Sequence, residues 1–131
     1  MTKGFVIAAP SSGSGKTLVT LGLLARFREL GVNVAGAKCG PDYIDPRFHE
    51  AATGRPSVNL DPWAMRADLI RNLQPPDADL LVVEGVMGLF DGGKASRGTQ
   101  RNFDRGNAPF QQRVGEWCSV IRIINDNDWH E

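Results

Sequence analysis

Short apolar runs alternate with stretches of helical periodicity along the first part of the chain. The runs at 5–9, 32–38 and 80–83 are typical of strands that a parallel sheet buries on both faces. Apolar residues recur at helical spacing over 16–30 and 64–73, and 46–53 is predicted to be a short helix that ends at Gly54. Gly31 and the Pro75–Pro76 pair stand where the two longer helices should stop. The alternation predicts an α/β fold, with a parallel sheet, flanking helices and right-handed crossovers.

The composition changes near Gly92. Apolar residues make up 42 of the first 91 positions but only 12 of the last 40. In the last part only 119–124 has the pattern of a strand, and the polar residues after it are typical of a turn. We therefore expect a folded part over 1–92 and a tail of different character over 93–131.

The charge balance and the cysteine count exclude several classes of partner. Fifteen Lys and Arg residues face fifteen Asp and Glu residues, so no net field draws the chain to nucleic acid or to an anionic membrane. No apolar run approaches the ~18 residues that a membrane span needs. Two cysteines, Cys39 and Cys118, are too few for a disulfide framework. These features predict no nucleic-acid or membrane partner and a cytoplasmic location.

A glycine-rich loop between the first strand and the first helix matches the phosphate-loop pattern. Gly15, Lys16 and Thr17 fit the pattern, whereas Pro10 stands where its first glycine is usual. Inward backbone amides, the helix N-terminus and the Lys16 ammonium would together hold phosphate groups, and the Thr17 hydroxyl would bind Mg²⁺. The predicted nucleotide-binding residues are Ser12, Gly13, Ser14, Gly15, Lys16 and Thr17. The alternative is a flexible Gly/Ser turn with an exposed lysine.

Acidic residues follow the second and third predicted strands. Asp42 and Asp45 come after the second strand, and Glu84 and Asp91 after the third. The carboxyl ends of parallel strands share one edge, where open α/β sheets bind ligands. Because Mg²⁺ prefers carboxylate, water and phosphate oxygens, these side chains are candidate ligands. Four carboxylates exceed the need of one ion, so either a second metal site or a second substrate is expected. For Asp42 and Asp45 the alternative is a role in turns.

Other residues near these strand ends have two interpretations each. Lys38 would bridge phosphate and an acidic substrate, or is an ordinary strand-end lysine. Cys39 is better explained as a packed thiol than as a nucleophile. Each of three further side chains would either line a substrate pocket or pack on a helix face: Tyr43, His49 and Trp63.

Three segments together resemble the cobyrinic acid a,c-diamide synthase family. They are 8–17, 38–46 and 83–92, and the intervening 52–56 and 59–63 are also similar to that family. The resemblance implies a P-loop NTPase-like domain similar to dethiobiotin synthetase, incomplete in this chain, that uses ATP and Mg²⁺. It further implies that the a and c carboxylates of a corrinoid acid are activated as acyl phosphates and converted into amides. The nitrogen would come from glutamine through a glutaminase domain, or from ammonia.

By this resemblance, the functional residues fall into two groups. The expected metal ligands are Thr17, Asp42, Asp45 and Glu84. The expected catalytic residues are Lys16, Lys38, Asp45 and Asp91. The family's substrate class leaves open whether the tetrapyrrole carries cobalt, nickel or no metal. A homodimer is among the expected arrangements of the chain.

The resemblance covers 4–92 and leaves residues 94–131 without a counterpart. A change of reading frame or a truncated gene model is the preferred explanation, and a divergent tail is the alternative. These residues also contain no segment that resembles the glutaminase domain. Two other functions are weighed against the synthase: a nucleotide-binding remnant without turnover, and a partitioning-type P-loop ATPase. The last carries an extra lysine early in the loop, where this chain has Pro10, Ser11 and Ser12.

Overall fold

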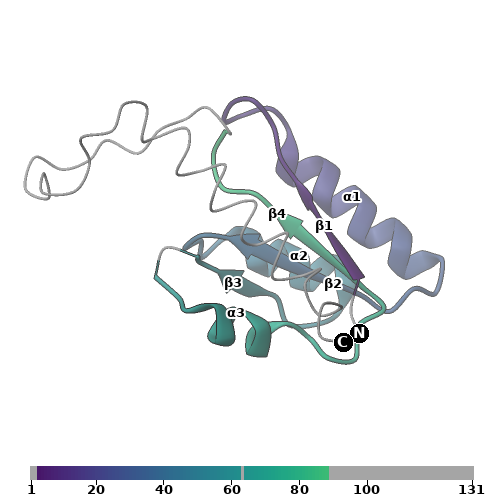
Figure 1. Ribbon diagram of the computed structural model, residues 1–131. Coiled ribbons are helices and arrows are strands. Elements are labelled where there is room, and N and C mark those ends of the chain that lie inside the picture. Colours follow the sequence, from purple (N-terminus) through teal and green to yellow (C-terminus); the bar gives the residue numbers. More distant parts are fainter. Residues whose placement is uncertain (1–2, 63, 89–131) are drawn as a thin grey trace, which may run out of the picture.

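The computed structural model describes residues 3–62 and 64–88 (Figure 1). Its helices and strands follow the order β1 (Lys3–Ile7), α1 (Lys16–Glu29), β2 (Val34–Cys39), α2 (Asp45–Thr53), β3 (Val58–Leu60), α3 (Ala67–Leu73) and β4 (Leu80–Glu84). The predicted elements within this range are therefore present, with ends shifted by a few residues. The predicted strand at 119–124 lies outside the described residues.

The four strands form one parallel sheet in the order β1-β4-β2-β3. β4 lies between β1 and β2, with Ile7 opposite Glu84 on one side and Lys38 opposite Glu84 on the other. β3 extends the sheet beyond β2, where Leu60 pairs with Cys39. The order confirms the predicted α/β class and brings the carboxyl ends of β1, β2 and β4 to one edge.

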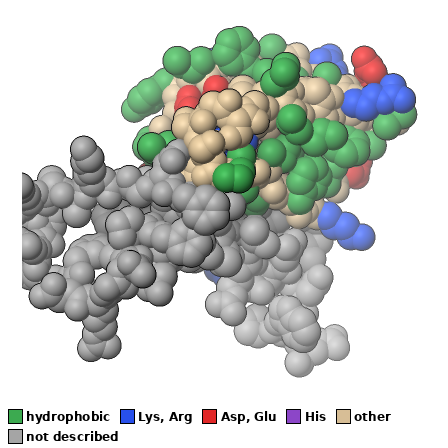
Figure 2. Space-filling model, turned by 90° about the horizontal axis from the view of Figure 1, so that it is seen from above, with side chains coloured by type: hydrophobic (Ala, Val, Ile, Leu, Met, Phe, Trp, Pro, Cys, Tyr) green, Lys and Arg blue, Asp and Glu red, His purple; other side chains and the backbone are tan. Residues whose placement is uncertain are grey.

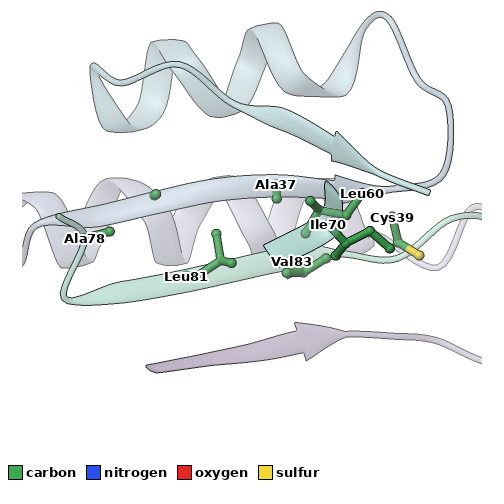
Figure 3. Close-up of a cluster of buried hydrophobic side chains, with 8 residues drawn as sticks. Ala37, Cys39, Leu60, Ile70, Ala78, Leu81 and Val83 are labelled. Atoms are coloured by element: carbon green, nitrogen blue, oxygen red, sulfur yellow. The ribbon is translucent and has the colours of Figure 1, made fainter. Parts of the chain in front are cut away.

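Alternating residues of β2 and β4 face two different helical layers. On one face, α1 and α2 pack on the sheet, and Leu24, Val34 and Val82 form a buried cluster. On the other face, α3 contributes Ile70 to a larger cluster of buried residues (Figure 3). That cluster consists of Ala35, Ala37, Cys39, Leu60, Ile70, Ala78, Leu81 and Val83. Cys39 is buried in it, which confirms the packed thiol.

The helix ends follow the predicted glycine signals. Gly31 has φ 80°, and the chain turns there so that the Val32 N–H bonds to the Phe27 carbonyl. Gly54 has φ 73° and donates its N–H to the Glu50 carbonyl at the end of α2. Both positions need the left-handed backbone conformation that glycine adopts without strain.

Helix α1 leaves part of its apolar surface exposed. Leu24 is completely buried, but Leu18 is 77% and Val19 is 53% exposed. Apolar side chains accordingly cover much of the surface that the described residues present in Figure 2. The periodicity thus located the helix correctly, and Leu24, one of its recurring apolar residues, is the one that α1 adds to the buried cluster.

Candidate nucleotide-binding site

The glycine-rich loop adopts the backbone that a phosphate loop requires. Gly13 and Gly15 have φ 74° and 80°, which a residue with a side chain would adopt only with strain. Gly15 caps α1, so the helix begins at Lys16 directly after the loop. The Ser14 hydroxyl donates to the Ser11 carbonyl at 2.8 Å and closes the turn. The N-terminal amides of α1 and the helix dipole therefore point to one anion-binding position.

Lys16 and Thr17 lie at the start of α1 and have different surroundings. The Lys16 side chain is buried, and its Nζ lies 3.4 Å from the Ser11 carbonyl oxygen. The Thr17 hydroxyl donates to Oε1 of Glu84 at 2.5 Å. The ammonium thus stays on the phosphate loop, whereas the hydroxyl links the loop to the end of β4.

Glu84 is a completely buried carboxylate with three donors. Its Oε1 accepts from Thr17 and, at 3.0 Å, from Lys38 Nζ, while its Oε2 lies 2.8 Å from His49 Nε2. Burial by itself would raise the pKa of Glu84, but the bonds from His49, Thr17 and Lys38 lower this pKa to about 2. The carboxylate is therefore ionised at neutral pH and held by charge and by hydrogen bonds.

Lys38 lies at the centre of the predicted acidic cluster. Its ammonium bonds to Glu84 and Asp45 and lies 3.7 Å from Asp42. Burial lowers the pKa of Lys38, yet the bonds to Asp45 and Glu84 outweigh burial and raise this pKa above its ordinary value. The structure therefore brings Lys38, Asp42, Asp45 and Glu84 together, as the sequence predicts.

Asp42 also has the turn role that the sequence analysis left open. Its Oδ1 accepts from the backbone N–H groups of Ile44 and Asp45, at 2.8 and 3.0 Å. Burial raises the pKa of Asp42, but these two bonds and the nearby Lys38 charge lower it overall. Asp42 thus shapes the chain entering α2, and its second oxygen faces Lys38.

The segment after β4 packs directly on the phosphate loop. A Cβ added to Gly88 would stand 2.6 Å from the Pro10 carbonyl oxygen and 2.7 Å from the Ser11 carbonyl carbon. Next to it, Met87 has φ 50°, and a Cβ on Gly40 would contact Val86 at 3.4 Å. This segment fills the space between the phosphate loop and the end of β2, as the shared sheet edge predicts.

The described residues contain suitable oxygen ligands for Mg²⁺. The Thr17 hydroxyl and Glu84 Oε1 are adjacent, with further carboxylates beyond Lys38. Within residues 3–62 and 64–88, no group of three or more His, Cys, Asp or Glu side chains is arranged to hold a metal ion. This arrangement fits Mg²⁺, which takes few protein ligands and completes its shell with phosphate and water.

The structure places the remaining candidate residues in different surroundings or does not describe them. Asp91 and Trp63 lie outside the described residues. Tyr43 is 89% exposed, so packing on a helix face does not account for it. His49, which the sequence leaves open between lining a pocket and packing on a helix face, has its ring against Glu84. No short motif links the two, since they lie 35 positions apart.

The parallel sheet, the phosphate loop at the start of α1 and the carboxylate at the end of β4 define a P-loop NTPase-like nucleotide-binding domain. Residues 5–124 match the family model of the CobQ/CobB/MinD/ParA nucleotide binding domain, and the chain belongs to this family. Among the described residues, none of the helices is long and apolar enough to span a membrane.

Curated relatives share more than half of the aligned residues. A hydrogenobyrinate a,c-diamide synthase of Agrobacterium fabrum is 58% identical over 93 residues, or 69% of this chain and 21% of its own. A protein of the same name from Rhizobium meliloti is 53% identical over 125 residues, or 93% of this chain and 27% of its own. These matches confirm the resemblance to the diamide synthase family. The chain spans about a quarter of the length of these relatives.

The matches also bear on the extent of the domain. Both the family model and the Rhizobium meliloti relative align with residues beyond 92. The division into 1–92 and a tail over 93–131, and the reading-frame explanation for that tail, stay predictions.

Proposed function

We propose that this chain provides the ATP- and Mg²⁺-binding part of a ligase that amidates the a and c carboxylates of hydrogenobyrinic or cobyrinic acid in cobalamin biosynthesis. One observation carries the proposal: Thr17 of the phosphate loop, next to Lys16 in the chain, donates to the buried Glu84, which also accepts from Lys38. The names of the relatives support the corrinoid substrate, and those names favour hydrogenobyrinate.

The chemistry requires phosphoryl transfer before amide formation. A carboxylate resists attack by ammonia, so the carboxylate oxygen first attacks the γ-phosphorus of ATP, and ADP leaves. Ammonia then attacks the acyl phosphate, the C–O bond to phosphate breaks, and inorganic phosphate leaves with the amide formed. Phosphoryl transfer depends on positioning and on charge neutralisation more than on a protein nucleophile.

The proposed residues serve these two requirements. Lys16 and the loop amides of Ser12–Gly15 would hold the triphosphate, and Thr17 with Glu84 would hold Mg²⁺, which neutralises phosphate charge. Asp42 and Asp45 would complete the metal surroundings through water. Lys38 is buried, and its ammonium pairs with Asp45 and Glu84. It would keep these carboxylates close together, and its positive charge would help to neutralise the transferred phosphoryl group. Asp91 is retained as a proposed catalytic residue.

Nitrogen is proposed to come from glutamine through a glutaminase domain, or from free ammonia. The reaction would take place in the cytoplasm. The nucleotide-binding remnant and the partitioning ATPase are kept as alternatives, and the test below distinguishes them.

The test has two stages on the full 131-residue chain. Calorimetric titration with ATP, with and without Mg²⁺, should show metal-dependent binding. Incubation with hydrogenobyrinic acid, ATP, Mg²⁺ and ammonium should then give products heavier by one and two amidations in mass spectrometry. Binding without amidation would favour the remnant. Absence of nucleotide binding would contradict the proposal, and ATP-dependent dimerisation on DNA would favour the partitioning class.

A further inference from the structure

The fold has room for the ring of His49 because the residue that faces it on β2 is a glycine. His49 lies on α2, is completely buried and faces β2 and β4. Gly36 of β2 makes room for it, because a Cβ there would stand 2.9 Å from His49 Cβ and 3.0 Å from Leu24 Cδ1. The absence of a side chain at position 36 thus allows an imidazole ring to lie directly on the sheet.

The ring is held on both sides. Nε2 lies 2.8 Å from Glu84 Oε2, and Nδ1 lies 3.3 Å from the Ser57 hydroxyl. That hydroxyl also lies 2.9 Å from the Gly36 carbonyl, and its one proton goes either to this carbonyl or to Nδ1. A chain of contacts therefore runs from the backbone of β2 through Ser57 and His49 to Glu84. A ring fixed at two points presents its Nε2 in one direction.

The two oxygens of Glu84 face different partners. Oε1 accepts from Thr17 of the phosphate loop and from Lys38. Oε2 is the oxygen that His49 contacts, on the side of α2. His49 thus satisfies one oxygen of a buried carboxylate and leaves the other directed at the loop. Without this contact, Oε2 would be left without its buried partner, and the carboxylate would be free to rotate toward other donors.

We propose that His49 is a positioning residue that fixes the Glu84 carboxylate so that Oε1 faces Thr17 and the Mg²⁺ of the bound nucleotide. The inference rests on the proposed function, because it assigns the metal dependence of nucleotide binding to a residue that touches neither nucleotide nor metal. Outer partners of metal-binding carboxylates typically change metal affinity about 10–100-fold when replaced. Binding of the metal-free nucleotide depends on the loop and Lys16, so His49 should affect it little.

The variants separate the contact from the volume of the ring. In His49→Gln, the side-chain amide can still donate to Glu84, whereas His49→Leu fills the space without a donor. Thr53→Val is the matched control: it removes another buried polar group of α2, a hydroxyl that donates to the His49 carbonyl and accepts from the Arg55 N–H, and it leaves Glu84 untouched. Each full-length variant is titrated with ATP in EDTA and then over a range of Mg²⁺ concentrations, and its folding is followed by circular dichroism.

For His49→Leu we expect the Mg²⁺ concentration for half-maximal enhancement of ATP binding to rise about 10–100-fold. Affinity in EDTA should stay within about twofold, and His49→Gln should restore most of the metal dependence. The Thr53→Val variant should resemble the wild type. Unchanged metal dependence in a folded Leu variant would overturn the proposal, as would equal loss in the Thr53→Val variant.

Two further outcomes are decisive. Should His49→Leu fail to fold, His49→Asn, which is too short to reach Glu84, takes its place. Failure of both to fold, with a folded Gln variant, would assign His49 to folding and overturn the proposal. A wild-type chain that binds no ATP would instead refute the proposed function itself, so the two failures are distinguishable.

Discussion

Glu84 and Lys16 are the two residues whose charges the site depends on most. Glu84 is buried at the end of β4 and takes donors from Thr17, Lys38 and His49. Lys16 is buried on the phosphate loop, with its ammonium beside the Ser11 carbonyl. One residue provides the fixed negative charge and the other the fixed positive charge, and each leads to a separate prediction.

Lys16→Ala should weaken ATP binding about 30–160-fold, because a charge-assisted bond to phosphate contributes about 2–3 kcal/mol. Calorimetry on the purified chain measures the change. Lys3→Ala provides the control, since Lys3 is an exposed lysine at the start of β1. An affinity in Lys16→Ala equal to that of the Lys3→Ala variant would remove Lys16 from the site.

The lowered pKa of Glu84 predicts a stability profile in acid. The folded state holds this pKa at about 2, below its ordinary 4.5, so the contribution to stability is complete above pH 4.5. It is lost as the pH falls from 4.5 toward 2, and by linkage it amounts to about 3 kcal/mol. Urea unfolding at several pH values measures it.

In Glu84→Gln this part of the pH dependence should disappear, and neutral stability should fall by about 3 kcal/mol because Lys38 loses a buried partner. Glu29→Gln is the control, because Glu29 pairs with Arg26 on the exposed surface of α1. If the free energy of unfolding falls with acid equally in Glu84→Gln and in the wild type, Glu84 is not the source of this pH dependence.

At the scale of elements, the segment after β4 acts as the support of the phosphate loop. Gly88→Ala would place a Cβ against the backbone of Pro10 and Ser11. A backbone segment cannot move aside as a flexible side chain can, so the loop itself would have to shift. A displaced loop should lower ATP affinity about 10–100-fold, since small misplacements of binding groups have effects of this size.

Gly22→Ala is the matched control for that substitution. Gly22 lies on α1 with nothing within 4 Å of an added Cβ, so alanine should leave affinity unchanged and stabilise the helix by about 0.5–1 kcal/mol. Calorimetry and thermal unfolding of the two variants test the pair. If Gly88→Ala binds ATP as Gly22→Ala does, the segment after β4 does not support the loop.

Several elements were predictable because their signal is local. The phosphate loop has the spacing of Gly15, Lys16 and Thr17, and β4 is a continuous apolar run that ends in Glu84. β3 was missed because it has only three residues, with Asn59 in the middle, and so shows neither a run nor an alternation. Helix α3 begins at Ala67, after the predicted start at Ala64.

Only some contacts of the site were predictable from the sequence, because the others depend on how the whole chain packs. The sheet edge could be inferred from strand ends, which placed Lys38, Asp42, Asp45 and Glu84 together. The link from His49 to Glu84 depends on how α2 packs over Gly36, which is a property of the folded chain and has no sequence motif. Asp91 remains a prediction.

At the scale of the molecule, the proposed function requires that one edge of the sheet binds a nucleoside triphosphate with Mg²⁺. Soaking or co-crystallising the full chain with a non-hydrolysable ATP analogue and Mg²⁺ tests this most directly. We expect electron density for the triphosphate inside the loop of Gly13–Gly15, with Lys16 Nζ on its outer phosphates and the metal beside Thr17. A triphosphate bound elsewhere, or an empty loop at saturating analogue, would contradict it.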